Sequence, residues 1–168
     1  MTTLIPQLIA TGGTIDKLYN PLTGNLDVGP PVLPAILATA GIRAEVASVL
    51  RKDSLEITDE ERATLAAFVA ASPAQRLLIT HGTDTMGASA ELIAASAPDK
   101  TVVLTGAMVP YSIAGSDAAF NVGVAYAAAQ CLPAGVYIAM HGQALPHAQY
   151  VKDRAQGRFI ASGLAAAS

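Results

Sequence analysis

Residues 77–107 read LLITHGTDTMGASAELIAASAPDKTVVLTGA, and this stretch decides the fold. Leu77–Thr80 and Thr101–Leu104 are short apolar runs of the length typical of buried strands, and Thr85–Ala97 between them has the length of a helix. A strand, a helix and a second strand in this order form a crossover unit in which the two strands lie parallel. The stretch therefore predicts a parallel sheet covered by helices.

The same alternation extends in both directions along the chain. Three further strands are predicted, at Leu4–Ala10, Ala44–Leu50 and Val136–Met140. Helices are predicted at Pro34–Ala40, after Thr58 and after Ser116-Asp117. Five short apolar strands separated by helices predict a doubly wound, mostly parallel α/β sheet with three layers, of the flavodoxin-like or Rossmann-like kind.

Helix starts and helix faces can also be predicted. Thr58 followed by Glu61 is a capping box, in which each side chain accepts a hydrogen bond from the other residue's backbone. The stripes predicted to face the core consist of Leu65, Phe68 and Val69 in the helix after Thr58, and of Phe120, Val124, Ala127, Ala128 and Cys131 in the helix after Asp117. The Pro/Gly/Asn-rich stretch 19–34 is expected to be a long functional loop.

Composition excludes several classes of protein. The chain has 168 residues, of which 52% are hydrophobic and 14% charged, against roughly 25% charged in an ordinary domain, so disorder and coiled coil are excluded. This length suits one domain, expected over residues 1–160, with a flexible Ala/Ser-rich tail at 161–168. The net charge of -3 argues against a nucleic-acid-binding protein. Abundant neutral surface favours a homo-oligomer, expected to be a homodimer or a homotetramer.

The sequence also gives expectations about location. Cys131 is the single cysteine and cannot form an internal disulfide, so a reduced cytoplasm is the simplest setting. The first residues lack the basic start and long apolar core of a signal peptide. Ala118–Met140 is uncharged and long enough to span a bilayer. Gly and Pro residues interrupt it, so we expect a helix and a strand there and no membrane span.

Ligands of doubly wound sheets bind outside the carboxyl ends of the strands. The segments after the five strands carry hydroxyls, glycines and carboxylates, and they are Thr11–Thr14, Arg51–Ser54, Thr80–Asp84, Thr105–Ala107 and His141–Gly142. We expect these segments to converge on one crevice. Thr11–Thr14 is neither a dinucleotide fingerprint nor a P-loop. Its glycines and threonine suit acyl transfer, which needs a nucleophile beside N–H donors, although the same residues also make tight turns.

Thr83, Asp84 and Lys152 form the second candidate group. Asp84 either caps the following helix or holds a substrate ammonium, with Thr83 as a second hydroxyl. Lys152 is either a solvated surface charge or, when buried beside Thr83, a base for the hydroxyl proton. No metal site is expected, because the three histidines, His81, His141 and His147, match no ligand spacing and are read as structural or surface residues.

Two motifs together resemble the bacterial-type L-asparaginases. They are Thr11-Gly-Gly-Thr-Ile15 and His81-Gly-Thr-Asp-Thr-Met86. Leu104–Pro110, Asp117 with Phe120-Asn121, and Asp53-Ser54 also resemble segments of that family. The resemblance covers about residues 4–160, which corresponds to the family's N-terminal domain.

The resemblance implies hydrolysis of L-asparagine to L-aspartate and ammonia, with no metal and no organic cofactor. Thr14 would be the nucleophile that forms an acyl-enzyme, Tyr19 would help to position and deprotonate it, and backbone N–H groups near Thr14 and Thr83 would bind the oxyanion. Thr83, Asp84 and Lys152 would form the second catalytic group. The implied substrate contacts are Gly13, Asp53, Ser54, Gly82, Thr83, Asp84 and Ala107, with Ser54 on the α-carboxylate and Asp84 on the α-ammonium.

The chain also departs from the family pattern. Members usually carry a C-terminal domain, and many have Gln where this chain has Leu55. We therefore expect a weaker KM for asparagine, since a hydrogen bond to a charged group contributes roughly 1.5–3 kcal/mol. Two alternatives remain open, an amidase that prefers glutamine or another amide, and a non-catalytic amino-acid sensor or partner subunit.

Overall fold

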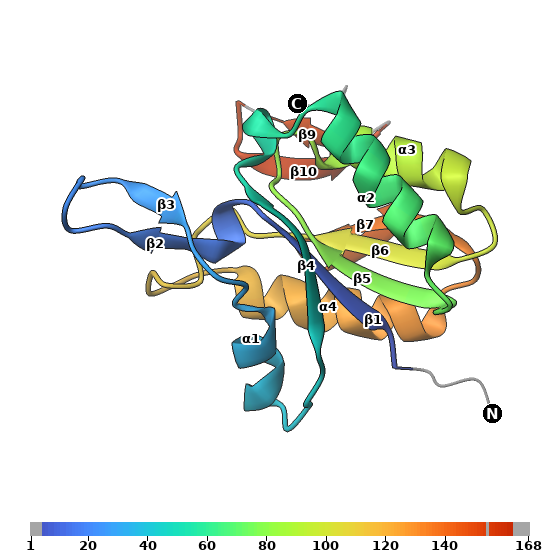
Figure 1. Cartoon of the computed structure of the whole chain (residues 1–168), viewed down its shortest axis with the longest axis horizontal. Coiled ribbons are helices and arrows are strands. Elements are labelled where there is room, and N and C mark those ends of the chain that lie inside the picture. The colour runs from blue at the N-terminus through green and yellow to red at the C-terminus, as the bar shows by residue number, and fades with distance from the viewer. Residues whose placement is uncertain (1–4, 154, 163–168) are drawn as a thin grey trace.

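The computed structural model describes residues 5–153 and 155–162. Its centre is a six-stranded sheet in the order β4-β1-β5-β6-β7-β8 (Figure 1). The first five strands in this order are parallel, and β8 pairs antiparallel with β7. The strands are β1 (Gln7–Gly12), β4 (Val46–Lys52), β5 (Arg76–Thr80), β6 (Thr101–Thr105), β7 (Gly135–Met140) and β8 (Gln143–Pro146). The predicted α/β class with a mostly parallel sheet is confirmed.

Helices cover both faces of this sheet and make three layers. They are α1 (Leu33–Thr39), α2 (Asp59–Ala71), α3 (Met86–Ser96) and α4 (Ala118–Cys131). Helices α2 and α3 pack with one set of strand residues, and α1 and α4 pack with the other set, as Figure 1 shows. Along β6, Val102 and Leu104 face the first core whereas Val103 faces the second, because side chains alternate along a strand.

The strand order identifies the edge at which a ligand would bind. The parallel strands, numbered by their place in the chain, follow the flavodoxin-like order 2-1-3-4-5, in which the winding reverses direction between β1 and β5. Ligands of such sheets bind in the crevice at this reversal, beyond the carboxyl ends of the strands. The segments that follow β1 and β5 are Gly13-Thr14 and His81–Asp84, so the fold brings the two candidate motifs to this edge.

The predicted buried face of α4 is correct only in part. Val124 and Ala128 are partly buried and pack against the second core, whereas Phe120 is 62% exposed and Ala127 and Cys131 are exposed. The buried residues of this helix are Ala118, Asn121, Val122, Ala125 and Ala129. Apolar residues surround α4 on every side, so the sequence did not single out one stripe, and the small alanines allow close approach to the sheet. In α2, Leu65 and Val69 are buried as predicted, but Phe68 is 38% exposed and Ala66 is buried in its place.

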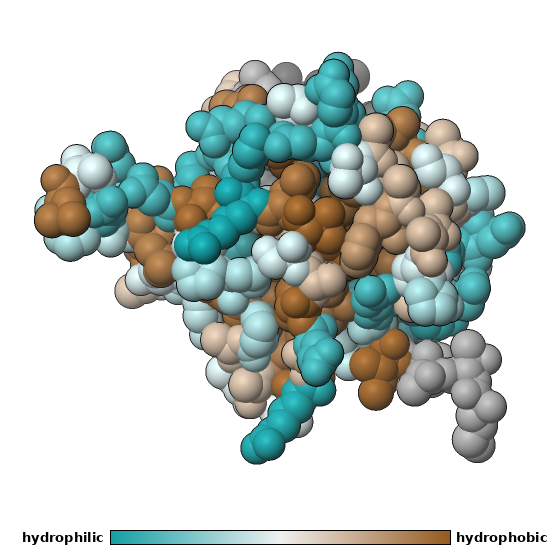
Figure 2. Space-filling model, in the orientation of Figure 1, coloured by the Kyte–Doolittle hydropathy of each residue, from teal (hydrophilic) through white to brown (hydrophobic). Residues whose placement is uncertain are grey.

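Residues 19–34 were expected to be one long loop, and this expectation holds only for residues 20–25 and 29–32. Strands β2 (Lys17–Tyr19) and β3 (Leu26–Val28) form an antiparallel hairpin, and α1 begins at Leu33. Each strand has three residues, too few to show an alternating pattern among the turn-forming residues. The hairpin projects from the body (Figure 1) and carries apolar surface at its tip (Figure 2), where Leu22 is 94% exposed.

A second hairpin, near the C-terminal end, was also not predicted from the sequence. It consists of β9 (Tyr150–Asp153) and β10 (Arg158–Ala161). Tyr150 and Phe159 bury their rings in the core beside α2 and α3, with ring centroids 5.5 Å apart. Strand β10 includes Ala161, the first residue of the predicted tail, and residues 163–168 lie outside the described part. A single domain over residues 1–160 stays a prediction.

Within the described residues, no helix has the length and apolarity needed to cross a bilayer. The uncharged stretch Ala118–Met140 divides into α4 and β7, as expected.

Candidate active site

The glycines after β1 bring two loops into backbone contact. Gly13 has φ +86°, and a Cβ on it would lie 2.4 Å from the backbone of Gly82. The Gly13 N–H donates to the Lys52 carbonyl oxygen at 2.8 Å. Only glycine adopts this backbone without strain, so the loop after β1 is built to lie directly on the loop after β5.

Thr14 starts a short 3₁₀ turn, Thr14–Asp16, closed by the Asp16 N–H on the Gly13 carbonyl oxygen at 3.1 Å. Its side chain is half-buried. No hydrogen bond joins the Thr14 hydroxyl to any other described residue, whereas Thr11 donates to the Thr80 carbonyl oxygen at 2.9 Å. The Thr14 hydroxyl is therefore uncommitted, on the loop that follows β1 at the carboxyl edge of the sheet, whereas Thr11 has the structural role.

Lys152 joins the loop after β5. Its Nζ donates to Thr83 Oγ1 and to Asp84 Oδ1, both at 2.8 Å. The Thr83 residue is 5% exposed and the Lys152 side chain 16% exposed, so Lys152 is not a solvated surface charge. Asp84 does not cap α3, whose N-cap position is Thr85. The three predicted residues are thus assembled as a hydroxyl, an amine and a carboxylate.

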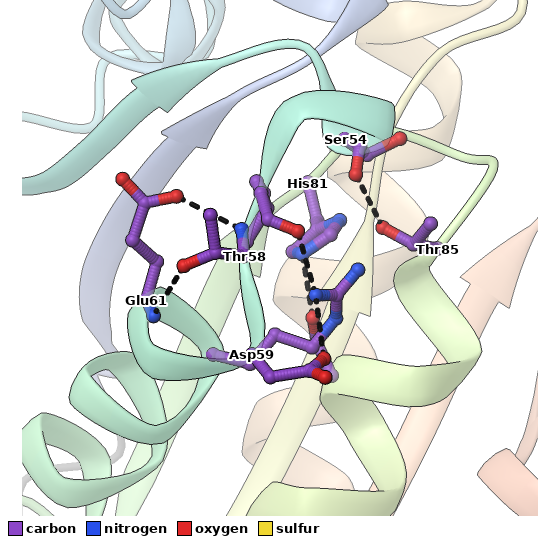
Figure 3. Close-up of polar contacts among 9 residues, drawn as sticks. Ser54, Thr58, Asp59, Glu61, His81 and Thr85 are labelled. Atoms are coloured by element: carbon purple, nitrogen blue, oxygen red, sulfur yellow. Dashed lines mark hydrogen bonds and ion pairs between the residues drawn. The ribbon is translucent and has the colours of Figure 1, made fainter.

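Ser54 also lies against Gly82, which is in contact with Gly13 as well. Ser54 is 1% exposed, and its Oγ has no hydrogen-bond partner. A Cβ on Gly82 would lie 2.6 Å from this Oγ, so the serine and the glycine loop are in contact. Figure 3 shows the Thr85 hydroxyl on the Ser54 carbonyl oxygen, a bond of 2.8 Å that fixes the serine backbone to the start of α3.

Asp53 precedes this serine and is the N-cap of its 3₁₀ turn, Ser54–Glu56. Its carboxylate pairs with Lys17 at 2.6 Å and accepts from the Leu55 N–H at 3.1 Å. Burial acts to raise the pKa of Asp53, but these two hydrogen bonds and the charges of Lys17 and Lys152 hold the pKa below its usual value.

The loop after β6 also lies against the loop after β5. A Cβ on Gly106 would lie 2.4 Å from the His81 carbonyl oxygen and 3.5 Å from Thr83 Cγ2. Ala107 follows and is fully buried. The Asp117 carboxylate accepts from the Met108 and Val109 N–H groups at 3.0 Å. Asn121, also fully buried, donates to the Gly106 carbonyl oxygen at 3.1 Å and to Asp117 at 2.7 Å.

Comparison with known proteins identifies this arrangement. The family model "Asparaginase, N-terminal" matches residues 7–160. The chain belongs to the asparaginase family. It is 37% identical over 142 residues to the L-asparaginase of Thermococcus kodakarensis, covering 79% of this chain and 42% of that protein. It is 30% identical over 151 residues to a subunit of the Glutamyl-tRNA(Gln) amidotransferase of Methanococcus vannielii, covering 82% of this chain and 34% of that protein.

Solved structures of the family agree with the fold. The thermostable L-asparaginase from T. kodakarensis superposes with a TM-score of 0.79 at 28% identity, covering 92% of this chain and 50% of the other. A probable cytoplasmic L-asparaginase from Campylobacter jejuni gives a TM-score of 0.76 at 28% identity, covering 88% and 49%. The chain therefore spans half or less of the length of these relatives, and it matches the family's N-terminal domain.

Tyr19 is the asparaginase-family residue that the structure does not bring to the others. It lies on β2 of the projecting hairpin and is 65% exposed. Its hydroxyl has no hydrogen bond to any described residue. A role for Tyr19 beside Thr14 stays a prediction.

His81 is structural, as expected. Its Nδ1 lies 2.8 Å from the Gly82 carbonyl oxygen and its Nε2 lies 2.9 Å from Ser89 Oγ. Because a carbonyl only accepts, the proton is assigned to Nδ1, and Ser89 donates to Nε2. Complete burial lowers the pKa of His81 to about 4. Among the described residues, no His, Cys, Asp or Glu cluster could hold a metal ion.

Asp16, in the same turn as Thr14, is a buried charged residue that sequence reasoning missed. It is 1% exposed, its Oδ1 accepts from the Val32 N–H at 2.8 Å, and its Oδ2 has no partner. Burial raises the pKa of Asp16 from 3.8 to about 6, against the opposing effects of the Val32 N–H and the Arg51 charge. An acidic residue next to a lysine in a polar stretch looks like surface charge, so the pattern gave no signal.

The Asp16→Asn variant is expected to be more stable than the wild type at neutral pH. Because folding raises the pKa of Asp16 from 3.8 to about 6, the wild type loses stability as pH rises through this window, by up to about 3 kcal/mol. Asparagine carries no charge to bury. Urea unfolding at pH 4 and pH 8 measures the difference between the two proteins. A difference that is equal at both pH values would contradict the prediction.

Replacing Gly13 by alanine is expected to destabilise the fold by more than about 3 kcal/mol, from the strain at positive φ and the contact with Gly82. The matched control is Gly123→Ala in α4, where a Cβ meets nothing within 4 Å. That change should stabilise the protein by about 0.5–1 kcal/mol. Denaturant unfolding of both variants provides the test, and similar midpoints for the two would contradict the close approach of the loops.

Proposed function

We propose that this chain is an amidohydrolase that converts L-asparagine to L-aspartate and ammonia. One observation carries the proposal: Lys152 donates at 2.8 Å to both Thr83 and Asp84, while the loop that precedes Thr83 lies against the loop that presents Thr14. Covalent amide hydrolysis requires a nucleophile and groups that transfer protons. The Thr14 hydroxyl and the group of Thr83, Lys152 and Asp84 can supply them. Membership of the asparaginase family supports the same conclusion.

In the proposed reaction, Thr14 Oγ attacks the side-chain amide carbon and transfers its proton toward the leaving nitrogen. Tyr19 assists this transfer once the hairpin closes. The negative oxygen of the tetrahedral intermediate binds backbone N–H groups near Gly82-Thr83 and Thr14. The C–N bond then breaks, ammonia leaves, and an acyl ester remains on Thr14. Water, which gives up a proton through Thr83 and Lys152, attacks the acyl carbon; the bond between that carbon and Thr14 Oγ breaks, the proton passes to Thr14 Oγ, and aspartate leaves.

The proposed substrate contacts follow from charge and burial. The Ser54 hydroxyl is buried without a partner, and a buried polar group in this state favours a ligand that can bind it; the substrate α-carboxylate is the proposed ligand. Asp84 is proposed to bind the α-ammonium beside Lys152. Asp53, whose negative charge lies nearby, adds to the attraction for the ammonium. The backbones of Gly13, Gly82 and Ala107 are proposed as further substrate contacts.

The alternative activities differ in measurable ways. Whether the enzyme prefers glutamine or another amide depends on the size of its substrate site. One methylene changes the free energy that distinguishes two substrates by only ~1–3 kcal/mol. A non-catalytic amino-acid sensor or partner subunit would need the ammonium and carboxylate contacts alone. The presence of a second hydroxyl with its own lysine favours catalysis over sensing.

Ammonia release is the test of the proposed function. Purified protein is assayed with L-asparagine, D-asparagine, L-glutamine, succinamate and an asparagine-containing peptide, and the binding of each amide is measured by calorimetry. The highest kcat/KM is expected for L-asparagine, with a weak KM because Leu55 offers no hydrogen bond. Binding of asparagine without ammonia release would establish the sensor instead.

Assembly and location belong to the same proposal. A homodimer or homotetramer is expected, so light scattering should give two or four times the chain mass of 17.1 kDa. A particle of 17.1 kDa would remove this expectation. A cytoplasmic location is proposed because one relative is named a probable cytoplasmic L-asparaginase, and cell fractionation checks it.

A further inference from the structure

The buried carboxyl of Asp16 lies two residues after the proposed nucleophile, within the same 3₁₀ turn. Its Oδ1 accepts from the Val32 N–H at 2.8 Å. Its Oδ2 is enclosed without a hydrogen-bond partner. A buried carboxyl with half of its hydrogen-bonding capacity unused lowers stability, so its presence calls for a role other than holding the fold together.

The Asp16 backbone joins the turn to the base of the projecting hairpin. The Asp16 carbonyl oxygen accepts from the Gly29 N–H at 2.8 Å, and the Asp16 N–H donates to Gly13 at 3.1 Å. Gly29 and Val32 belong to the segment between β3 and α1. One residue therefore connects the Thr14 turn, the end of the Tyr19 hairpin and the start of α1.

The charges around Asp16 are few. Arg51 of β4 is the cation that acts on its pKa, and the Arg51 Nε donates to the Val28 carbonyl oxygen at 3.3 Å. Segment 29–41 contains no titratable side chain. Lys17, which follows Asp16, pairs with Asp53 instead, and the loop after β6 adds Tyr111, whose N–H donates to Ile15 at 3.2 Å.

We propose that Asp16 is a positioning residue for Thr14: its ionised carboxylate holds the Thr14 turn to Val32 and so fixes the nucleophile relative to the hairpin. This role rests on the proposed function. A hydrogen bond to an ionised carboxylate is about twice as strong as one to a neutral acid. The turn is therefore held more firmly above the pKa of about 6 than below it.

The first experiment needs no catalysis. In ¹H–¹⁵N NMR spectra recorded between pH 4.5 and 8, the Val32 amide proton should shift with a midpoint near 6 in the wild type and show no such titration in Asp16→Asn. Asp27→Asn is the matched control, because Asp27 is an exposed carboxylate on the same hairpin, and it should leave the Val32 titration unchanged. A Val32 proton that does not titrate in the wild type overturns the proposal, whatever the activity.

The second experiment measures ammonia release over the same pH range. The wild-type kcat should fall with an apparent pKa near 6 on the acid side, and this limb should disappear in Asp16→Asn, with kcat at pH 8 lowered ~10- to 100-fold and KM little changed. Equal kcat for the two proteins at pH 8 overturns the positioning role. The two proposals can fail separately. If the Val32 amide shift titrates but the protein releases no ammonia, the proposed function is overturned and the positioning role falls with it. The contact between Asp16 and Val32 is then still supported.

Discussion

Thr14→Ala should abolish ammonia release, with a loss of at least ~10³-fold in kcat, while the protein remains folded. Removal of a nucleophile leaves only binding and oxyanion contributions to the rate. The Thr14 hydroxyl bonds to no other described residue and is half-buried, so its loss should change the free energy of unfolding by less than about 0.5 kcal/mol. Steady-state kinetics and urea unfolding measure the two effects.

Two variants sharpen the Thr14 experiment. Thr14→Ser keeps a hydroxyl at the same place and should retain part of the activity. Thr64→Ala removes an exposed hydroxyl of α2 that donates only to the Glu60 carbonyl oxygen, and it should behave as the wild type. Activity near the wild-type value in Thr14→Ala would assign the nucleophile to another residue.

Lys152→Met should lower kcat by ~10²–10⁴-fold, the usual contribution of proton transfer by a positioned side chain. Methionine has a similar length but removes both hydrogen bonds of Nζ, those to Thr83 and to Asp84. Turnover assays compare this variant with Lys52→Met, which removes a more exposed lysine that pairs with Glu61 and should keep normal kcat.

Lys152→Arg separates the two ways in which the amine could act. A guanidinium keeps the positive charge beside Asp84 but does not give up a proton. Arginine therefore cannot replace Lys152 if the lysine transfers protons. A Lys152→Arg protein with wild-type kcat would show that the positive charge alone is needed. A Lys152→Met protein with wild-type kcat would contradict any role for the amine in the reaction.

The sheet and the convergence of the loops could be predicted from the sequence because each depends on a local pattern. Runs such as Leu77–Thr80 are apolar throughout because both faces of a parallel sheet are covered. Gly13 and Gly82 mark places where backbones approach each other. The capping box at Thr58 and Glu61 is confirmed, with bonds of 3.3 and 3.0 Å.

The missed features depend on distant contacts. Strand β2 and strand β3 have three residues each, and β9 is recognised only when Tyr150 and Phe159 are seen in the core. The buried face of α4 is set by the shape of the sheet, which favours Ala125 and Ala129 over the larger Phe120. The burial of Asp16 depends on the Val32 N–H, sixteen residues away along the chain, and no short-range pattern indicates it.

The position of Lys152 on β9 has a consequence for biosynthesis. The five parallel strands and the helices α1 to α4 precede Tyr150 in the chain, so they leave the ribosome before the hairpin that supplies the amine. A nascent chain can therefore complete the central sheet and still lack the Thr83–Lys152 bond. The proposed chemistry needs Lys152, so it requires residues 150–161 to be translated and docked, and shorter nascent chains hold Thr14 and Thr83 without the amine.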